Sequence, residues 1–495
     1  MKAIPSKPEW QAVIDIGSNS VRLVIYDVAG RALLPHYNEK VMARLGASLS
    51  RNGKLSRDGK KVAMKAIQRY DAILNGLNVT KLRAVGTAAV RRASDGQDFV
   101  AQIEKQTGIR VDIIDGAEEA RLSALGVDGS VYQASGTVGD LGGSSLEFAH
   151  LSKGKVKSVE THMLGPLALS PEGLDVEALR QRVRKSLSNS KALKKKGGRF
   201  YMVGGAWRAL AKLHMDLSSY PLRQLHAYVM DRKALDEIAA IAEVDNAINR
   251  QRLEKISVKR SSVLPYASIL LGEIFRIGEF HDVMLSSHGL REGLVLDSLQ
   301  KSASKDPLLD GVALSARLYE QRRDFGRALM KWVRQTVDPS TDLFGNVGVD
   351  HRLIGAACLL ADSGARFHPD TRAQLAFDQS LTAPYTGVTH PERVFIALAI
   401  GNRYSRRFRA PEKVMGLLSA EQSRLAKQLG AAMRLGAVFS GRSSELLQVG
   451  RLHRGEKTVS LIVSEKHKSM VSSMVERRLE TLAEVLELKA SIEIS

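Results

Sequence analysis

Over its first 300 residues the chain alternates between segments with the apolar pattern of β-strands and segments in which apolar residues recur every three or four positions, as in helices. Tight turn residues at 17–20 join two apolar, β-branched runs, and this pattern predicts a β-hairpin close to the N-terminus. Strands are expected at residues 12–16, 21–27, 82–85 and 109–114, and helices at residues 57–76, 97–106 and 117–126. Alternation of this kind favours an α/β class of fold, and we expect a first domain over residues 1–130.

The same alternation resumes and then gives way to helical spacing. A second αβ domain is expected over residues 131–301, and it contains a strand–loop–strand unit, amphipathic helices and a strand that runs into two glycines. These features are expected at residues 138–151, 176–193 and 200–205, with the block closing at residues 286–293. Helical periodicity predicts an α-helical domain over residues 302–440. A strand, a helix and a strand at residues 458–463, 471–488 and 491–494 predict a small αβ cap over residues 441–495.

Charge and composition narrow the choice of partner and compartment. The 495 residues contain 73 Lys and Arg against 53 Asp and Glu, a formal net charge of +20 that indicates a polyanionic partner. Basic residues cluster at 191–199 and at 403–409. Aromatic residues make up only 5% of the chain and do not interleave these clusters in a base-stacking pattern, so nucleic acid is a less favoured partner. The single cysteine, Cys358, excludes an intrachain disulfide. Without a long apolar run or a recognisable leader, we expect a cytoplasmic protein with no membrane partner.

An internal repeat carries the candidate chemistry. The segment D-I-G-S-N-S-V-R-L-V begins at Asp15, and D-L-G-G-S-S-L-E-F-A begins at Asp140 in the same register. Glycine and small residues leave backbone N–H groups uncovered for an anion, and an aspartate at a strand end is a hard oxygen ligand for Mg²⁺. Two such hairpins facing each other would hold a phosphate group from both sides. Neither a Walker A motif nor a dinucleotide-binding G-x-G-x-x-G is present.

Five motifs in order resemble one family. They are D-I-G-S-N-S at 15–20, G-T-A-A-V-R at 86–91, D-G-A-E-E-A-R-L at 115–122, D-L-G-G-S-S-L-E at 140–147 and G-L-R-E-G at 289–293. Together they resemble the exopolyphosphatase/guanosine pentaphosphate phosphatase (Ppx/GppA) family. The resemblance implies duplicated actin/sugar kinase/Hsp70-like (RNase H-like) domains, followed by a helical domain related to HD phosphohydrolases and the small αβ C-terminal cap.

The resemblance also implies roles for individual residues. Glu119 would be the general base that deprotonates the attacking water, and Arg91 would contact the terminal phosphoryl oxygens. Asp140 would hold Mg²⁺, and Glu147 would support the metal or its waters, so both also count as catalytic. The phosphate would be held by small residues of the two hairpins and of a third, glycine-rich loop. These substrate-binding candidates are Ser18, Asn19, Ser20, Gly142, Gly143, Ser144, Ser145, Gly204 and Gly205.

Some positions depart from the family pattern. Ser144 stands where a third glycine is usual, and Ser287 stands where an aspartate precedes the L-R-E-G motif. In the helical region Ala361 occupies the position of the metal-binding histidine of an HD pair. We therefore expect this domain to be catalytically inactive, with a role in packing, dimerisation or polyanion binding. The remaining histidines, His351, His368 and His390, are expected at the surface or at helix ends.

These observations lead to a first functional hypothesis and its alternatives. The leading hypothesis is a Mg²⁺-dependent exopolyphosphatase that removes the terminal phosphate of inorganic polyphosphate. The alternative with the same site chemistry is hydrolysis of the 5′-terminal phosphate of guanosine pentaphosphate (pppGpp). A kinase or ATPase of the same superfold and a non-catalytic polyanion-binding protein are less favoured. A homodimer is expected from the family resemblance.

Overall fold

A computed structural model describes residues 9–166, 175–299, 306–316, 323–334 and 349–495, so the predicted boundary at 301/302 lies outside the described residues. The chain divides into two compact units, one of residues 7–307 and one of residues 308–495. Among the described residues, no helix is both long and apolar enough to cross a lipid bilayer. The two units are taken in turn below.

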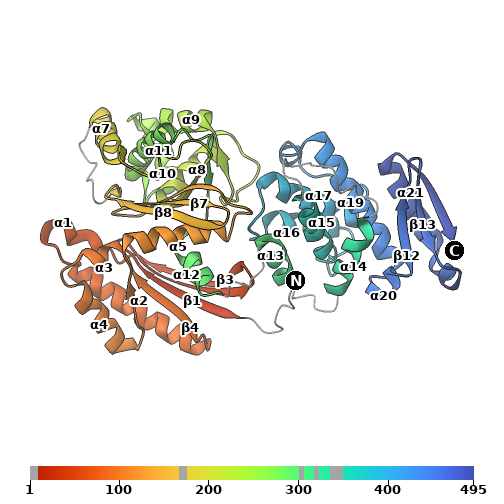
Figure 1. The fold of residues 1–495 in the computed structure, drawn as a ribbon, viewed down its shortest axis with the longest axis horizontal. Helices are drawn as coiled ribbons and strands as arrows, with labels where there is room; N and C mark the ends of the chain where they lie inside the picture. The colour runs from red at the N-terminus through yellow and green to blue at the C-terminus, as the bar shows by residue number, and fades with distance from the viewer. Residues whose placement is uncertain (1–8, 167–174, 300–305, 317–322, 335–348) are drawn as a thin grey trace. The chain divides into compact units, whose positions relative to one another are not determined.

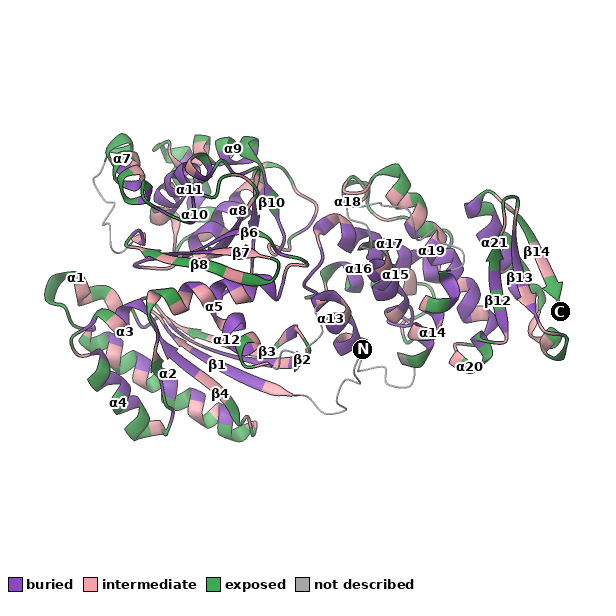
Figure 2. Ribbon diagram, viewed as in Figure 1, coloured by how far each residue is buried: buried purple, intermediate pink, exposed green. Residues whose placement is uncertain are grey.

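The first sheet of residues 7–307 has the strand order β3-β2-β1-β4-β5 (Figure 1). Strands β1 to β3 are antiparallel, whereas β4 and β5 run parallel to β1. The strands are β1 (Trp10–Ile16), β2 (Val21–Ala29), β3 (Ala32–Val41), β4 (Lys81–Gly86) and β5 (Asp112–Ile113). The associated helices are α1 (Leu49–Asn52), α2 (Arg57–Gly76), α3 (Ala88–Arg92) and α4 (Gly96–Thr107). Figure 2 shows α2 and α4 with exposed outer faces and buried faces toward the sheet.

The second sheet repeats this plan with the strand order β10-β11-β9-β6-β7-β8. Its strands are β6 (Gly136–Leu141), β7 (Leu146–Ser152), β8 (Lys155–His162), β9 (Arg199–Gly204), β10 (Val229–Met230) and β11 (Asp282–Leu285). Its helices are α7 (Val176–Leu187), α8 (Gly205–Leu217), α9 (Arg232–Ala242), α10 (Ala247–Ser257) and α11 (Leu264–Gly278). Strand β6 pairs antiparallel with β7 and parallel with β9, as β1 pairs with β2 and β4, which confirms the duplicated fold that the repeat predicted.

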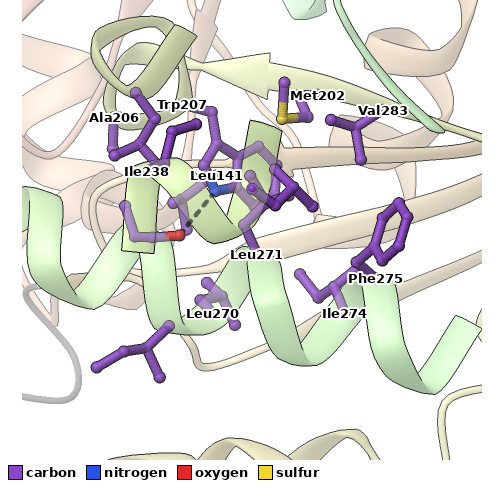
Figure 3. Packing of buried hydrophobic residues seen from close by; sticks show 14 of the residues in the cluster. Leu141, Met202, Ala206, Trp207, Ile238, Leu270, Leu271, Ile274, Phe275 and Val283 are labelled. Atoms are coloured by element: carbon purple, nitrogen blue, oxygen red, sulfur yellow. Dashed lines mark hydrogen bonds between the residues drawn. The ribbon is translucent and has the colours of Figure 1, made fainter. Parts of the chain in front are cut away.

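A buried tryptophan organises the helical side of the second sheet. Trp207 of α8 is fully buried, and its indole N–H donates to the carbonyl oxygen of Ala267 in α11 at 3.3 Å (Figure 3). Leu141, at the end of β6, belongs to the same cluster. The cluster therefore supports the strand end from which Asp140 projects, since burial of large apolar side chains is the main stabilising term in such a core.

Two helices each follow one sheet in the sequence but pack on the other sheet. Helix α5 (Gly116–Asp128) follows the first sheet but packs its alanines on the second, while α12 (Leu290–Asp297) follows the second sheet but packs on the first. The two helices touch each other, and the contact depends on glycine. A Cβ on Gly293 would lie 1.9 Å from the carbonyl oxygen of Leu122. A Cβ on Gly126, near the end of α5, would lie 2.2 Å from the carbonyl oxygen of Gly289 at the start of α12, so the two helices pack antiparallel.

In residues 308–495, helices form most of the described structure. They are α13 (Pro307–Ser315), α14 (Arg323–Val333), α15 (Val349–Leu359), α16 (Arg372–Thr382), α17 (His390–Tyr404), α18 (Glu412–Met415), α19 (Ala420–Phe439) and α20 (Ser444–Leu447). A small sheet of order β12-β13-β14 follows, with β12 (Gly450–Arg454), β13 (Thr458–Val463), α21 (Ser473–Leu486) and β14 (Lys489–Ile494). The helical region and αβ cap expected from periodicity are present.

The structure differs from the sequence-based expectations in a few elements. The strand expected over 109–114 is reduced to Asp112–Ile113, and the helix expected to reach residue 193 ends at Leu187. Strands β3 and β8 were not predicted, because their polar, alternating sequences suit the outer edge of a sheet. The expectation of surface or helix-end positions is confirmed for His368, which is exposed, and for His390, which begins α17 although it is only 2% exposed.

Candidate active site

The two repeated hairpins meet across a cavity of about 310 Å³ in the unit of residues 7–307. Each hairpin closes with the same 3.0 Å backbone hydrogen bond, from Gly17 N to Ser20 O and from Gly142 N to Ser145 O. The hydroxyl oxygens of Ser18 and Ser144 lie 3.4 Å apart. The turns that the repeat predicted therefore face each other.

Most of the residues singled out from the sequence surround this cavity. Those on its wall are Ser18, Asn19, Ser20, Glu119, Asp140, Gly142, Gly143, Ser144, Ser145, Gly204 and Gly205. Arg91 and Glu147 are not among the lining residues. Arg91 contacts Glu119, and Glu147 stands opposite Asp140 on the paired strands β6 and β7.

Glu119 occupies the first turn of α5, where the Asp115 side chain accepts from the N–H of Glu118 at 2.7 Å and begins the helix. The neighbouring Glu118 points elsewhere, since its two oxygens each lie 2.7 Å from the Arg121 guanidinium. Only 12% of the Glu119 side chain is exposed, against 36% for Glu118. Of the two adjacent glutamates, only Glu119 reaches the cavity.

Burial changes the protonation of Glu119. Desolvation, followed by repulsion from Asp140, raises the pKa of Glu119 to about 7, and the Arg91 guanidinium opposes this rise. Arg91 Nη1 lies 3.3 Å from Glu119 Oε2 and also donates to the carbonyl oxygen of Ile114 at 2.6 Å. A carboxylate with this pKa is suited to accepting a proton near neutral pH.

Asp140 and Glu147 stand directly opposite each other on the antiparallel strands β6 and β7. Their side chains therefore share one face of the sheet. Burial raises the pKa of Asp140, although the Ser123 hydroxyl donates to its Oδ2 at 2.5 Å. Burial, and then repulsion from Glu119, raises the pKa of Glu147 well above its ordinary value. Glu147 is 2% exposed, and its Oε1 has no hydrogen-bond partner.

The family resemblance implies a divalent metal, and these two carboxylates fit one. Their oxygens are the hard ligands that Mg²⁺ prefers, and a buried carboxylate oxygen without a partner is costly unless a cation or proton satisfies it. Over the described ranges of the chain, no group of three or more His, Cys, Asp or Glu side chains forms a complete metal centre. Mg²⁺ commonly takes only one or two carboxylates and completes its shell with water and substrate phosphate.

The two hairpins of the repeat share one strand pairing but carry opposite charges at the position that faces the aspartate. Arg22 stands opposite Asp15 in the first hairpin, in the position that Glu147 holds opposite Asp140 in the second. Asp15 is paired with Arg291 of α12 at 2.9 Å, whereas no ion pair of this kind is formed by Asp140 in the part of the chain that the structure describes. The first hairpin therefore presents a neutralised aspartate and a cation, and the second presents two carboxyl groups that form no ion pair in the described structure.

A cationic wall around the cavity was not foreseen as a site. Six basic side chains line it, and burial followed by repulsion from Arg260 lowers the pKa of Lys40 to about 8. These residues are Arg22, Lys40, Arg208, Lys259, Arg260 and Arg291. Arg22 could have been found from the charge exchange in the repeat, and Arg291 from the G-L-R-E-G motif. Lys40, Lys259 and Arg260 lie outside the five motifs and carry no local sequence signal.

Two glycines, Gly204 and Gly205, allow the cationic wall to pack closely against the glycine-rich loop that they form. Gly204 has a φ of 122°, a conformation that favours glycine, and a Cβ there would lie 2.5 Å from the carbonyl oxygen of Leu141. A Cβ on Gly205 would lie 2.5 Å from Nη2 of Arg260. The glycine pair therefore allows the Arg260 guanidinium to lie against the start of α8.

Comparison with known proteins agrees with this geometry. A family model described as the Ppx/GppA phosphatase family matches residues 24–302, and one described as exopolyphosphatase, C-terminal, matches residues 318–492. This chain belongs to the Ppx/GppA phosphatase family. Solved structures from the Ppx/GppA family share its actin-like fold. The Aquifex aeolicus family member has a TM-score of 0.53 at 23% identity, covering 59% of this chain and 97% of that one. An exopolyphosphatase from Cytophaga hutchinsonii has a TM-score of 0.54 at 21% identity, covering 59% and 99%.

Curated relatives of this Ppx/GppA chain carry two different names. It is 28% identical over 290 residues to a guanosine-5′-triphosphate,3′-diphosphate pyrophosphatase of Aeromonas salmonicida, a match over 57% of this chain and 58% of that protein. It is 27% identical over 320 residues to exopolyphosphatase 1 of Mycobacterium leprae, a match over 61% and 91%. The family model establishes the family, and the names of these relatives leave two substrates to be compared.

Proposed function

We propose that this Ppx/GppA family phosphatase is an exopolyphosphatase, which hydrolyses the terminal phosphoanhydride bond of inorganic polyphosphate. The observation that carries the proposal is the position of Glu119. Its buried carboxylate faces a cavity whose walls combine two anion-binding hairpins with six basic side chains. A base next to a phosphate cradle is the arrangement needed for attack by water on phosphorus.

In the proposed reaction, Glu119 accepts a proton from the attacking water while a new bond forms between the water oxygen and the terminal phosphorus. The bond from that phosphorus to the bridging oxygen breaks, and the shortened chain leaves with the bridging oxygen. Backbone N–H groups of residues 18–20 and 143–145 stabilise the phosphoryl oxygens, as preorganised donors do in such reactions. Arg91 supports this step by holding the Glu119 carboxylate in place.

Asp140 and Glu147 would hold the Mg²⁺ ion. When bound, the ion supplies positive charge that offsets the charge on the phosphoryl oxygens and on the leaving chain. The basic side chains that line the cavity bind the rest of the substrate. Arg22, Lys40 and Arg260 take no part in proton transfer; they neutralise successive phosphates of the chain.

The lining of the cavity favours a phosphate chain over a nucleotide. Among the described lining residues there is no Phe, Tyr or Trp on which a guanine could stack. The second candidate function is hydrolysis of the 5′-terminal phosphate of guanosine pentaphosphate. It is favoured by the Aeromonas salmonicida relative, whose name refers to guanosine-5′-triphosphate,3′-diphosphate. On the family resemblance, we further propose that the protein is a cytoplasmic homodimer and that its HD-like domain has no phosphohydrolase activity.

The test is phosphate release from long-chain polyphosphate and from guanosine pentaphosphate, measured in parallel with Mg²⁺. We expect a higher kcat/KM for polyphosphate. Faster release from guanosine pentaphosphate would make the nucleotide the substrate in place of polyphosphate, with the same proposed catalytic residues. Release from neither substrate would overturn the proposed function.

A further inference from the structure

An arginine cluster lies in the unit of residues 308–495, on the helices α17, α19 and α21. In Figure 1 these helices lie in the blue part of the chain, and α19 packs against both α17 and α21. The cluster is formed by Arg403 of α17, Arg434 of α19 and Arg478 of α21, with Arg406 just after α17. None of these four residues is part of the cavity described above.

The contact between α17 and α19 places Arg434 beside Arg403. At Gly430 a Cβ would lie 3.1 Å from the backbone nitrogen of Arg403, so the two helices approach closely there. Arg434 follows Gly430 by four residues, which is about one helical turn and therefore the same face of α19. That face carries Arg434 toward the end of α17.

The contact between α19 and α21 places Arg478 on the other side of Arg434. The side-chain amide of Gln428 donates to the carbonyl oxygen of Val485 at 3.0 Å and joins the two helices. Arg434 lies six residues after Gln428, and Arg478 lies seven residues before Val485. Gly450 lies against Phe439 at the end of α19 and pairs with Val463, shortly before α21 begins, so the two helices run antiparallel. Arg434 and Arg478 therefore stand at similar heights along them.

The cluster has little negative charge to balance it. The neighbouring charges with the largest effect on Arg434 are those of Arg478, Arg403 and Arg406, which are all cations. Burial, followed by this repulsion, lowers the pKa of Arg434 to about 10. Arg406 has a partner in Glu484 at 2.5 Å, but no ion pair is formed by Arg434 or Arg478 in the described structure.

Buried donors in the cluster are also unsatisfied. Arg403 is 8% exposed, and its contact with Asp362 is long at 3.5 Å. Nε of Arg403 and Nε of Arg478 are both buried without a hydrogen-bond partner. Guanidinium groups that repel one another and retain free donors are costly in a folded protein, unless an anion bridges them.

We propose that Arg403, Arg434 and Arg478 form a binding site for a phosphate group, separate from the catalytic cavity. Planar guanidinium forks match the oxygen atoms of a tetrahedral phosphate, and several forks around one phosphate offset its full charge. The phosphate group belongs either to inorganic phosphate or to a phosphate chain, since both present the same oxygens. Binding here requires no hydrolysis, so the site stands apart from the proposed function.

Hydrogen–deuterium exchange of the full chain in Mg²⁺-free buffer with a chelator locates phosphate binding directly. Inorganic phosphate should slow exchange in peptides of α19 and α21, and Arg434→Gln and Arg478→Gln should each weaken this effect by about tenfold in phosphate concentration. Protection around residues 17–20 should stay unchanged in both variants. Arg477→Gln, an exposed neighbour of Arg478 on α21, is the matched control and should behave as the parent.

Thermal unfolding distinguishes a phosphate-binding role of Arg434 from a purely structural one. Because its charge is unpaired, Arg434→Gln should raise the Tm in phosphate-free buffer and reduce the gain in Tm that phosphate gives. A second titration with tripolyphosphate distinguishes the sources: tighter binding than inorganic phosphate indicates a phosphate chain, and equal binding indicates a single phosphate. The proposal is overturned if phosphate gives no protection in α19 and α21, or if Arg434→Gln is protected at the same phosphate concentrations as the parent.

Discussion

Arg91 Nη1 lies 3.3 Å from Oε2 of Glu119 and connects the end of α3 to the first turn of α5. The same guanidinium donates to the carbonyl oxygen of Ile114 at 2.6 Å, so it is held from two sides. Arg91 does not line the cavity. Its contact with the phosphoryl oxygens stays a prediction, whereas its contact with the proposed base is present in the structure.

The Arg91–Glu119 contact predicts a shift in the pH profile. Glu119 must be unprotonated to accept a proton, so activity should fall as the pH drops below about 7. Arg91 lowers the pKa of Glu119, and Arg91→Gln should therefore move the acid limb of kcat/KM to higher pH, by about one pH unit. Arg91→Lys keeps the charge and should restore part of the shift. An unmoved acid limb in Arg91→Gln would contradict the positioning role.

Glu119 should also destabilise the metal-free protein at neutral and higher pH. Its folded-state pKa of about 7 exceeds the ordinary value of 4.5, so the folded state holds the proton more tightly. Stability is unaffected below pH 4.5, falls as the pH rises from there through about 7, and is then lower by about 3 kcal/mol. Glu119→Gln removes this titration. Denaturant unfolding in a chelator should show the variant more stable than the parent at pH 8, and equal to it at pH 4.

Glu147 provides a test of the metal assignment. Its unpartnered Oε1 and its place opposite Asp140 make it a proposed Mg²⁺ ligand. Glu147→Gln should raise the Mg²⁺ concentration needed for half-maximal activity by about tenfold or more, since even outer-shell partners of a metal contribute that much. Glu118→Gln serves as the control and should keep the Mg²⁺ dependence of the parent. An unchanged dependence in Glu147→Gln would remove this residue from the metal site.

The crossing of α5 and α12 predicts opposite effects for two glycines. Gly293→Ala would place a methyl group 1.9 Å from the Leu122 carbonyl oxygen, which forces the helices apart and should cost about 1–3 kcal/mol. Gly272, inside α11, has open space where an alanine methyl group would stand, with no atom within 4 Å. Gly272→Ala should be neutral or stabilising by up to about 1 kcal/mol. Equal effects on urea unfolding would contradict the close crossing.

Much of the fold was predictable because local signals agreed with the tertiary structure. The helix expected over residues 57–76 has those limits in the structure, where the Ser56 hydroxyl accepts from Gly59 N and begins it. The repeated hairpins were predictable for the same reason, since glycine and small residues specify a turn wherever it lies. Strands β3 and β8 were missed because they are stabilised by pairing with distant strands rather than by their own composition.

For the candidate site, the motifs identified the side chains but not their partners. The pairing of Asp15 with Arg291 joins residues 276 positions apart, and it depends on α12 returning to the first sheet. Lys40 and Arg260 reach the cavity from elements with no shared motif. Long-range contacts of this kind follow from topology, which a single sequence does not display.

The central claim is that Glu119 is the base, and the most direct measurement compares it with its neighbour. Phosphate release from polyphosphate should fall by about 10²–10⁴-fold in Glu119→Gln. The same measurement on Glu118→Gln should match the parent, because Glu118 is held by Arg121 outside the cavity. A Glu119→Gln protein as active as the parent, or a Glu118→Gln protein equally impaired, would contradict the account.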